Sequence, residues 1–255
     1  MRVAVCSTKG GVGKTTTAAN LAAVLGQRGR TLAVDADAQE GLGRAFGVIA
    51  GHQDSLAGVL SDDKADVRSA IRTDVAEGVD LLSAHPSLNG VGVALAQQGG
   101  LITSIKRALR PVNASYDFVV IDTHADTGDL TLAAIAAADS VLTVFTSDPG
   151  SALGVVRLVS FLNTHRKFEN TSAKLLGVVC SNWDRTGAAA REVAAALAET
   201  NLPIFTTRIP FSRRVASAAL AKRPVVLRAP RSPVAMAYFS LADEALTAYR
   251  EVLAA

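Results

Sequence analysis

The chain has 255 residues, of which 49% are hydrophobic and 5% aromatic, and its formal net charge is +3. This length and composition suit one large α/β domain over residues 1–255, with enough apolar surface to bury both faces of a sheet. No apolar run reaches the roughly 18 residues that a membrane-spanning helix needs, so the sequence excludes a transmembrane protein.

Strand and helix signals alternate along the chain. Apolar runs predict strands over residues 2–7, 31–35, 79–83, 117–122, 140–146, 175–181 and 204–207. Helical patterns cover residues 15–28, 55–60, 64–71, 87–97, 101–109, 129–138, 151–164, 187–200, 212–221 and 234–253. Several strands are apolar throughout, which is typical of strands buried on both faces. We therefore predict a doubly wound, mostly parallel sheet flanked by helices, with Gly29 as the left-handed residue that ends the first helix.

The loop between the first strand and the first helix is rich in glycine and contains two lysines. Residues 9–16 read Lys-Gly-Gly-Val-Gly-Lys-Thr-Thr. Backbone N–H groups of such a loop, together with the positive end of the following helix, form a site for phosphates. In a P-loop, Lys14 reaches the β- and γ-phosphates and the Thr15 hydroxyl binds Mg²⁺. The predicted nucleotide-binding residues here are Lys9, Gly10, Gly11, Val12, Gly13, Lys14, Thr15 and Thr16.

Carboxylates end two further predicted strands. The second strand runs into Asp35 and Asp37, and four apolar residues precede Asp122. The carboxyl edge of a parallel sheet faces the crevice where ligands bind. Asp122 has the position of a Walker B aspartate, which holds Mg²⁺, often through a water. Strand alternation puts Asp35 and Asp37 on one side, where one of them can approach Mg²⁺ or the attacking water.

The P-loop departs from the general pattern, because Thr8 stands where the first glycine is expected and Lys9 opens the loop. With this second lysine the loop resembles the deviant Walker A motif of the ParA/MinD family of P-loop ATPases. The resemblance extends over nearly the whole chain, and it implies an ATPase that uses ATP and Mg²⁺. It implies that Lys9 reaches the partner's nucleotide across a dimer interface, and that Asp37 activates the hydrolytic water with support from Gln39. The implied metal-binding residues are Thr15, Asp37 and Asp122.

The segment after Asp122 departs from the family pattern. Thr123 is kept, but His124 and Ala125 follow where two prolines are typical. A histidine here invites a general-base role, yet the family chemistry needs none, and a loop histidine near the dimer interface is the simpler interpretation. For the adenine base, the resemblance implies contacts from Asn182 and from the turn at Pro210 and Phe211; a structural role at the strand ends is the alternative.

Basic residues concentrate in the last quarter of the chain. Residues 200–242 contain no Asp or Glu but seven basic residues, namely Arg208, Arg213, Arg214, Lys222, Arg223, Arg228 and Arg231. A patch of one sign suits a phosphate backbone, although a solvated basic face is the alternative. The resemblance implies ATP-dependent, non-specific DNA binding through Arg214, and we expect Arg213, Lys222 and Arg223 to contribute.

Taken together, the resemblance implies a DNA-partitioning ATPase that is cytoplasmic and associated with the nucleoid. ATP would close a sandwich homodimer that binds double-stranded DNA, and a ParB-like protein would stimulate hydrolysis and release. A MinD-like membrane ATPase is one alternative, but Asp243, Glu244 and Glu251 make the last helix acidic, so anionic lipid would repel it. A ParA-like ATPase that positions a protein cargo is a second alternative. Lys9 and the Asp37 segment disfavour a third, a metabolic enzyme of the dethiobiotin synthetase type.

The two cysteines give no sign of a metal or redox site. Cys6 and Cys180 both lie within apolar runs, far apart in the sequence. Metal binding would need further ligands at short spacing. We therefore expect two buried, reduced thiols, which fits a reducing compartment.

Overall fold

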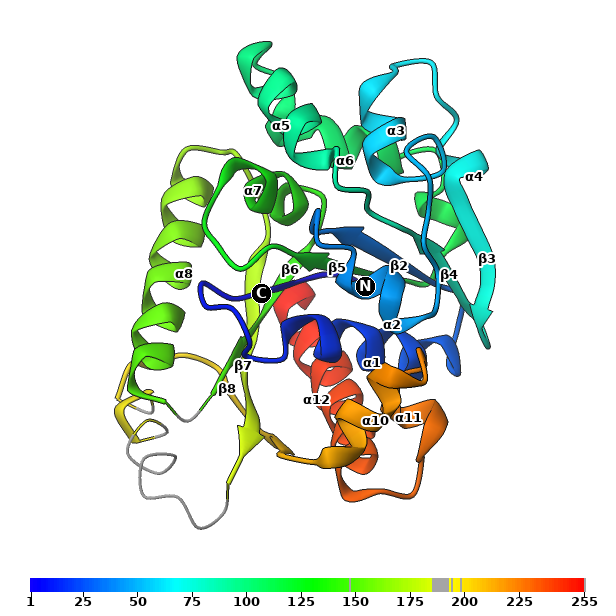
Figure 1. The fold of residues 1–255 in the computed structure, drawn as a ribbon. Helices are drawn as coiled ribbons and strands as arrows, with labels where there is room; N and C mark the ends of the chain where they lie inside the picture. Colours follow the sequence, from blue (N-terminus) through cyan, green and yellow to red (C-terminus); the bar gives the residue numbers. More distant parts are fainter. Residues whose placement is uncertain (147, 185–192, 194, 198, 255) are drawn as a thin grey trace.

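The computed structural model describes residues 1–146, 148–184, 193, 195–197 and 199–254. These residues form an eight-stranded sheet with the order β3-β4-β2-β5-β1-β6-β7-β8 (Figure 1). Every neighbouring pair is parallel except β3 and β4. The mostly parallel, doubly wound sheet predicted from the sequence is confirmed.

The strands are β1 (Arg2–Cys6), β2 (Thr31–Ala36), β3 (Ile71–Ala76), β4 (Val79–Leu82), β5 (Phe118–Thr123), β6 (Ser140–Phe145), β7 (Lys174–Trp183) and β8 (Ile204–Pro210). The helices are α1 (Lys14–Gly26), α2 (Gly41–Ala45), α3 (Leu56–Ser61), α4 (Val67–Ala70), α5 (Leu88–Gln97), α6 (Leu101–Leu109), α7 (Asp129–Ala136), α8 (Pro149–Lys167), α10 (Arg213–Leu220), α11 (Val225–Arg228) and α12 (Pro233–Ala254), with a 3₁₀ turn at Asn113–Ser115.

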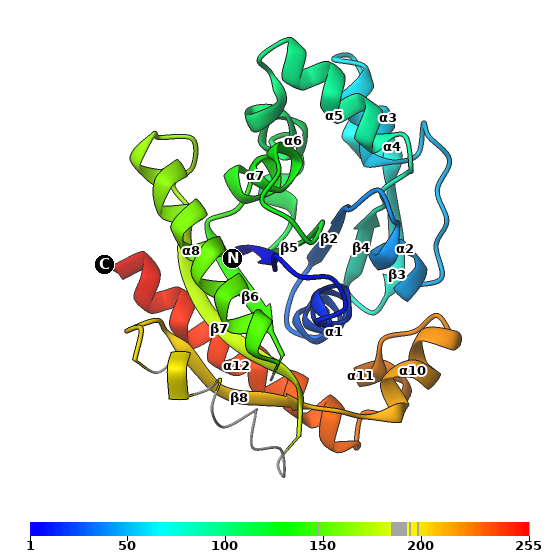
Figure 2. The same ribbon diagram turned by 60° about the vertical axis from the view of Figure 1, so that its left-hand side comes forward.

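Helices cover both faces of the sheet, as the two views in Figures 1 and 2 show. Strand β1 illustrates why, since Val3 and Val5 pack in the same core as α1 and α12, whereas Ala4 and Cys6 pack with α6, α7 and α8. A strand with apolar residues on both faces needs a cover on each. Helix α1 is rich in alanine, so many of its side chains are small, and residues 17–26 are all buried. It therefore lies close to the sheet and fixes the loop that precedes it.

Two sequence expectations need correction here. The helix predicted over residues 64–71 is wrong at its end, because α4 stops at Ala70 and β3 begins at Ile71. Gly29 is not a left-handed cap, because α1 already ends at Gly26 and Gly29 is not among the glycines with positive φ. A side chain at Gly29 would instead meet Asp117 Oδ2 at 2.7 Å. The helix predicted over residues 187–200 falls largely outside the described residues.

Candidate nucleotide-binding site

The glycine-rich loop joins β1 to α1 at the carboxyl edge of the sheet. Gly11 and Gly13 have φ values of 76° and 88°, which favour glycine over residues with a side chain. Gly13 is also packed tightly, since a Cβ at this position would lie 2.9 Å from Ser181 Oγ. The Ser181 hydroxyl donates to the carbonyl of Val12. The end of β7 thus holds the loop against the start of α1, where the backbone N–H groups gather.

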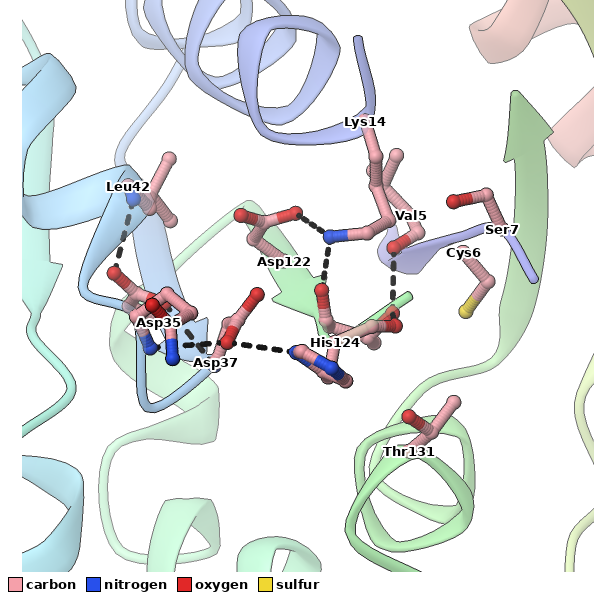
Figure 3. A network of polar contacts seen from close by, with 12 residues as sticks. Val5, Cys6, Ser7, Lys14, Asp35, Asp37, Leu42, Asp122, His124 and Thr131 are labelled. Carbon is pink, nitrogen blue, oxygen red and sulfur yellow. Dashed lines mark hydrogen bonds and ion pairs between the residues drawn. The ribbon is translucent and has the colours of Figure 1, made fainter. Parts of the chain in front are cut away.

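Lys14 and Asp122 form a buried ion pair at the centre of the site (Figure 3). Lys14 Nζ lies 3.0 Å from Asp122 Oδ1 and also donates to the carbonyl of Thr123. Burial raises the pKa of Asp122, and the Lys14 charge opposes that shift. Asp122 Oδ2 is buried and has no hydrogen-bond partner among the described residues. An unsatisfied buried carboxylate oxygen fits a Mg²⁺ ion or one of its waters, which supports the predicted placement of the metal beside Thr15.

Asp35 serves the backbone of the next segment. Its carboxylate accepts hydrogen bonds from the N–H groups of Asp37, Leu42 and Gly43 at 3.0–3.1 Å. Burial and the nearby Asp122 raise the pKa of Asp35 to about 7, although the hydrogen bonds from the backbone N–H groups of Gly43 and Asp37 act to lower it. With these bonds made, Asp35 fixes the start of α2, so Asp37 is the carboxylate of this pair that can approach a ligand.

Asp37 lies just past the end of β2, close to the buried pair. Its Oδ1 accepts the N–H of Gln39 at 3.0 Å and lies 3.0 Å from His124 Nδ1. The Asp37 side chain is 12% exposed and that of His124 is 49% exposed. In Figure 3 Asp37, Asp122 and Lys14 point into one space. From the sequence, His124 was weighed as a general base and preferred as a loop residue near an interface; its contact with Asp37 was not predicted.

The residues predicted for base binding meet at the ends of β7 and β8. Asn182 is exposed and has a φ of 51°, and Pro210 pairs with Trp183 across the two strands. Phe211 is 68% exposed, and its N–H donates to the carbonyl of Trp183. The Arg208 guanidinium lies 4.3 Å from the Trp183 ring centroid. Trp183 was not predicted as part of this site, although an aromatic residue directly after Asn182 was a usable signal.

The basic residues predicted to bind DNA lie on and after α10. Arg213 and Arg214 begin this helix, Lys222 and Arg223 follow it, and all four side chains are exposed. None of the four forms an ion pair with a described residue. Arg223 lines a small cavity of about 170 Å³ together with Thr15 from the start of α1. The structure therefore places the basic segment directly beside the P-loop helix.

Comparison with known proteins identifies the family. A family model described as an AAA domain matches residues 1–175. The chain is 36% identical to the chromosome-partitioning ATPase Soj of Thermus thermophilus, over 98% of this chain and 97% of Soj. It is 30% identical to the chromosome partitioning protein ParA of Myxococcus xanthus, over 95% of this chain and 86% of ParA. The chain belongs to the ParA/MinD family of P-loop ATPases.

A solved structure supports the same assignment of the fold. It is that of cobyrinic acid a,c-diamide synthase from Mycobacterium smegmatis, with ADP and magnesium bound. The match covers 98% of this ParA/MinD-family chain and 95% of the synthase chain, with a TM-score of 0.83 and 30% sequence identity. The fold of the chain is thus that of a known nucleotide-binding protein.

Lys9, which distinguishes the loop of this ParA/MinD-family ATPase from an ordinary P-loop, is paired within its own chain. Its Nζ lies 2.5 Å from Asp148 Oδ1, at the start of α8. Hydrogen bonds from Lys9 and Thr146 lower the pKa of Asp148. The side chains of Lys9 and Asp148 are 49% and 40% exposed. An exposed pair of this kind contributes at most about 1 kcal/mol, so Lys9 can leave Asp148 for a stronger anion.

Other classes of site find no support in the part of the chain that the structure describes. There, no helix has both the length and the apolar character to cross a membrane, and no group of three or more His, Cys, Asp and Glu side chains is placed to hold a metal ion. Cys6 and Cys180 are free and buried, as predicted, and burial raises the pKa of Cys6 to about 12. Mg²⁺ at a P-loop needs no such cluster, because a hydroxyl, phosphates and waters supply most of its ligands.

Proposed function

We propose that this ParA/MinD-family ATPase is a ParA-type partition ATPase. ATP binding would close a homodimer, the dimer would bind double-stranded DNA without sequence preference, and a ParB-like partner would stimulate hydrolysis and release. The observation that carries the proposal is the position of the basic segment. Arg213 and Arg214 are exposed at the start of α10 and form no ion pair with a described residue. Arg223, just after α10, lines one cavity with Thr15 of the P-loop helix.

The nucleotide-binding part of the proposal assigns each group at the sheet edge a role. The N–H groups of Gly10–Thr16 would bind the phosphates, and Lys14 would move from Asp122 to the β- and γ-phosphate oxygens. Thr15, Asp122 and Asp37 would hold Mg²⁺ and its waters, with the free Asp122 Oδ2 as the buried acceptor. Mg²⁺ supplies charge compensation for the phosphates when it is bound. Asn182, Pro210 and Phe211 would contact the base.

Hydrolysis then requires a group that orients the attacking water, and we assign this role to Asp37. Both oxygens of Asp35 accept backbone N–H groups, whereas in Asp37 the described backbone donors reach Oδ1 and leave Oδ2 available. Lys9 of the partner protomer would reach the phosphates and stabilise the charge that develops there, as an arginine finger does in other P-loop enzymes.

Dimerisation explains why DNA binding would depend on ATP. Each phosphate contact releases counterions, so the affinity rises steeply with the number of contacts and falls steeply with salt. One protomer offers the four exposed side chains that we expect to contact DNA, namely Arg213, Arg214, Lys222 and Arg223. Two protomers held together double that number and act as a bivalent ligand.

The experiment that tests the proposal measures binding to random-sequence duplex DNA with ATP, with ADP and without nucleotide, each across a series of salt concentrations. Tight binding with ATP alone, with a steep loss of affinity at higher salt, is the expected result. Absence of DNA binding in all nucleotide states would contradict the partition function. It would turn attention to a protein or lipid partner.

Replacing Arg214 with glutamate is expected to spare ATP-dependent dimerisation and to weaken DNA binding at least tenfold. The exposed guanidinium makes no ion pair with a described residue, so its loss breaks none of the described ion pairs, whereas the new carboxylate repels phosphates. Fluorescence anisotropy with labelled duplex measures the affinity. The matched control is Arg72→Glu, an exposed arginine on β3 at the far edge of the sheet. Equal DNA affinity of Arg214→Glu and wild type would place the DNA surface elsewhere.

Replacing Lys9 with alanine is expected to leave ATP binding within about threefold of wild type and to abolish ATP-dependent dimerisation. Lys9 is half exposed, and its partner Asp148 is partly exposed as well, so the protomer loses little when Lys9 is removed. Light scattering of the ATP-bound protein measures the dimer, and Lys167→Ala, an exposed lysine at the end of α8, is the control. A normal dimer in Lys9→Ala would contradict the role of Lys9 across the interface.

The membrane alternative is disfavoured by the packing of the last helix. Leu241 and its apolar neighbours on α12 are buried against the sheet, and Asp243 pairs with Arg28 at 2.7 Å. Glu244 accepts hydrogen bonds from the N–H groups of Thr206 and Thr207 on β8. The apolar face of α12 is therefore not available to lipid.

The other alternative, an ATPase that positions a protein cargo, would also bind DNA in its ATP-bound state. Identification of the partner, either a DNA-bound ParB-like protein or a protein cargo, would distinguish it from DNA partition.

A further inference from the structure

The contact between His124 and Asp37 follows from the register of two neighbouring strands. Strands β2 and β5 are parallel, and Ala36 and Thr123 are their last paired residues. Asp37 and His124 come one residue later, each at the carboxyl end of its strand. Their side chains meet with a distance of 3.0 Å between Asp37 Oδ1 and His124 Nδ1, as Figure 3 shows.

The direction of this hydrogen bond is set by chemistry. An ionised carboxylate only accepts, so the imidazole donates through Nδ1–H. The same Oδ1 accepts the N–H of Gln39, also at 3.0 Å. Neither bond uses Oδ2, and no other hydrogen bond from a described residue reaches this oxygen. Two donors on Oδ1 thus fix the rotation of the carboxylate and leave Oδ2 as the acceptor that can take a new ligand.

The backbone that carries His124 is itself anchored. The Thr123 hydroxyl lies 3.1 Å from both the Val5 carbonyl and the His124 carbonyl. The Thr123 carbonyl accepts the Lys14 ammonium. The backbone next to His124 is therefore held by β1 and by the P-loop lysine, so the imidazole that donates to Asp37 is carried by an anchored segment.

We propose that His124 is a positioning residue for ATP hydrolysis: its Nδ1–H holds Asp37 Oδ1, so that Oδ2 faces the bound nucleotide and accepts a hydrogen bond from the attacking water. This inference rests on the role proposed above for Asp37. Proline, which is typical of the family at this position, has no side-chain donor and could not make this contact. His124 therefore supplies a hydrogen bond to Asp37 that a proline at this position would lack.

The test compares steady-state ATP hydrolysis of His124→Ala, His124→Asn and His124→Gln with that of wild type, at saturating Mg²⁺. The amide nitrogen of asparagine can occupy the place of Nδ1, whereas that of glutamine corresponds to Nε2. We expect kcat to fall about tenfold in His124→Ala and His124→Gln, with KM for ATP within about twofold, because the contact orients the catalytic carboxylate and not the nucleotide. His124→Asn should recover most of kcat. His165→Ala is the control, since His165 makes a similar Nδ1 contact, to Asn170, at the far end of α8.

Asp37→Ala, measured in the same series, separates the two proposals. A slow Asp37→Ala together with an unchanged kcat in His124→Ala would overturn the role of His124 alone. Equal losses in His124→Ala and His124→Asn would also overturn it, because the donor would then not be what matters. A wild-type rate in Asp37→Ala would overturn the proposed role of Asp37 and the inference on His124 with it.

Discussion

Replacing Lys14 with alanine is expected to abolish ATP binding and to destabilise the fold at the same time. Lys14 is only 6% exposed, and its ammonium is the charge partner of the fully buried Asp122. Without it the protein loses the cation that would meet the β- and γ-phosphates, and a carboxylate is left buried without compensation. Removing one partner of a buried ion pair costs about 3 kcal/mol or more of unfolding free energy.

Titration calorimetry with Mg-ATP and urea unfolding measure the two effects of Lys14→Ala separately. We expect an affinity loss on the order of a thousandfold, about 4 kcal/mol. The double variant Lys14→Ala with Asp122→Asn removes the buried charge as well, so it should regain stability without regaining ATP binding. Lys64→Ala, an exposed lysine between α3 and α4, is the control. ATP binding near wild-type strength in Lys14→Ala would contradict the assignment of this loop to the phosphates.

The parts of the site that could be predicted from the sequence are those that depend on local chain order. A glycine-rich loop that follows an apolar strand and ends in Lys-Thr at the start of a helix is typical of a phosphate-binding loop, so the place of Lys14 at the start of α1 could be predicted from its neighbours. Asp122 was predictable because four apolar residues mark a buried strand that must end at the carboxyl edge of the sheet. In both cases the sequence signal and the predicted site residue lie within a few residues of each other.

The parts that could not be predicted depend on pairing between distant segments. The contact of Lys9 with Asp148 and that of Ser181 with Val12 each join residues more than 130 positions apart. The contact of His124 with Asp37 depends on which strands are neighbours and on their register, and an apolar pattern gives neither. A correct strand order with β5 next to β2 would have been enough to find it.

Strand β3 was missed for a different reason. Its residues, Ile71–Ala76, are half-buried or exposed, because the strand lies at the edge of the sheet and pairs only with β4. The strand therefore has no apolar run, and Asp74 interrupts it with a left-handed backbone, a φ of 55°. The Asp74 N–H is bonded to the Asp80 carboxylate on β4. Such a strand is held by its partner and not by its own sequence pattern.

Replacing Asp37 with alanine is expected to leave ATP binding intact and to slow hydrolysis by about a hundredfold or more, the range typical of a lost acid–base group. The phosphates would still have Lys14 and the P-loop N–H groups, so the ATP-bound state should form and persist. If the DNA step follows dimerisation, DNA binding with ATP should last longer in this variant than in wild type. Single-turnover hydrolysis and the lifetime of the DNA complex measure these two outcomes.

The variant Asp37→Asn distinguishes two roles of Asp37. One is to accept a hydrogen bond from the attacking water, and the other is to hold the local structure. The amide oxygen of asparagine can still accept from the Gln39 N–H and from His124, so a purely structural role would be restored. The other position then carries an NH₂ group, which cannot accept a hydrogen bond from the attacking water in the role proposed for Asp37 Oδ2. Hydrolysis as slow in Asp37→Asn as in Asp37→Ala is therefore the result we expect, with Asp54→Ala, an exposed aspartate, at the wild-type rate. Near-normal hydrolysis in Asp37→Asn would show that the turn, and not the free carboxylate oxygen, is what the reaction needs.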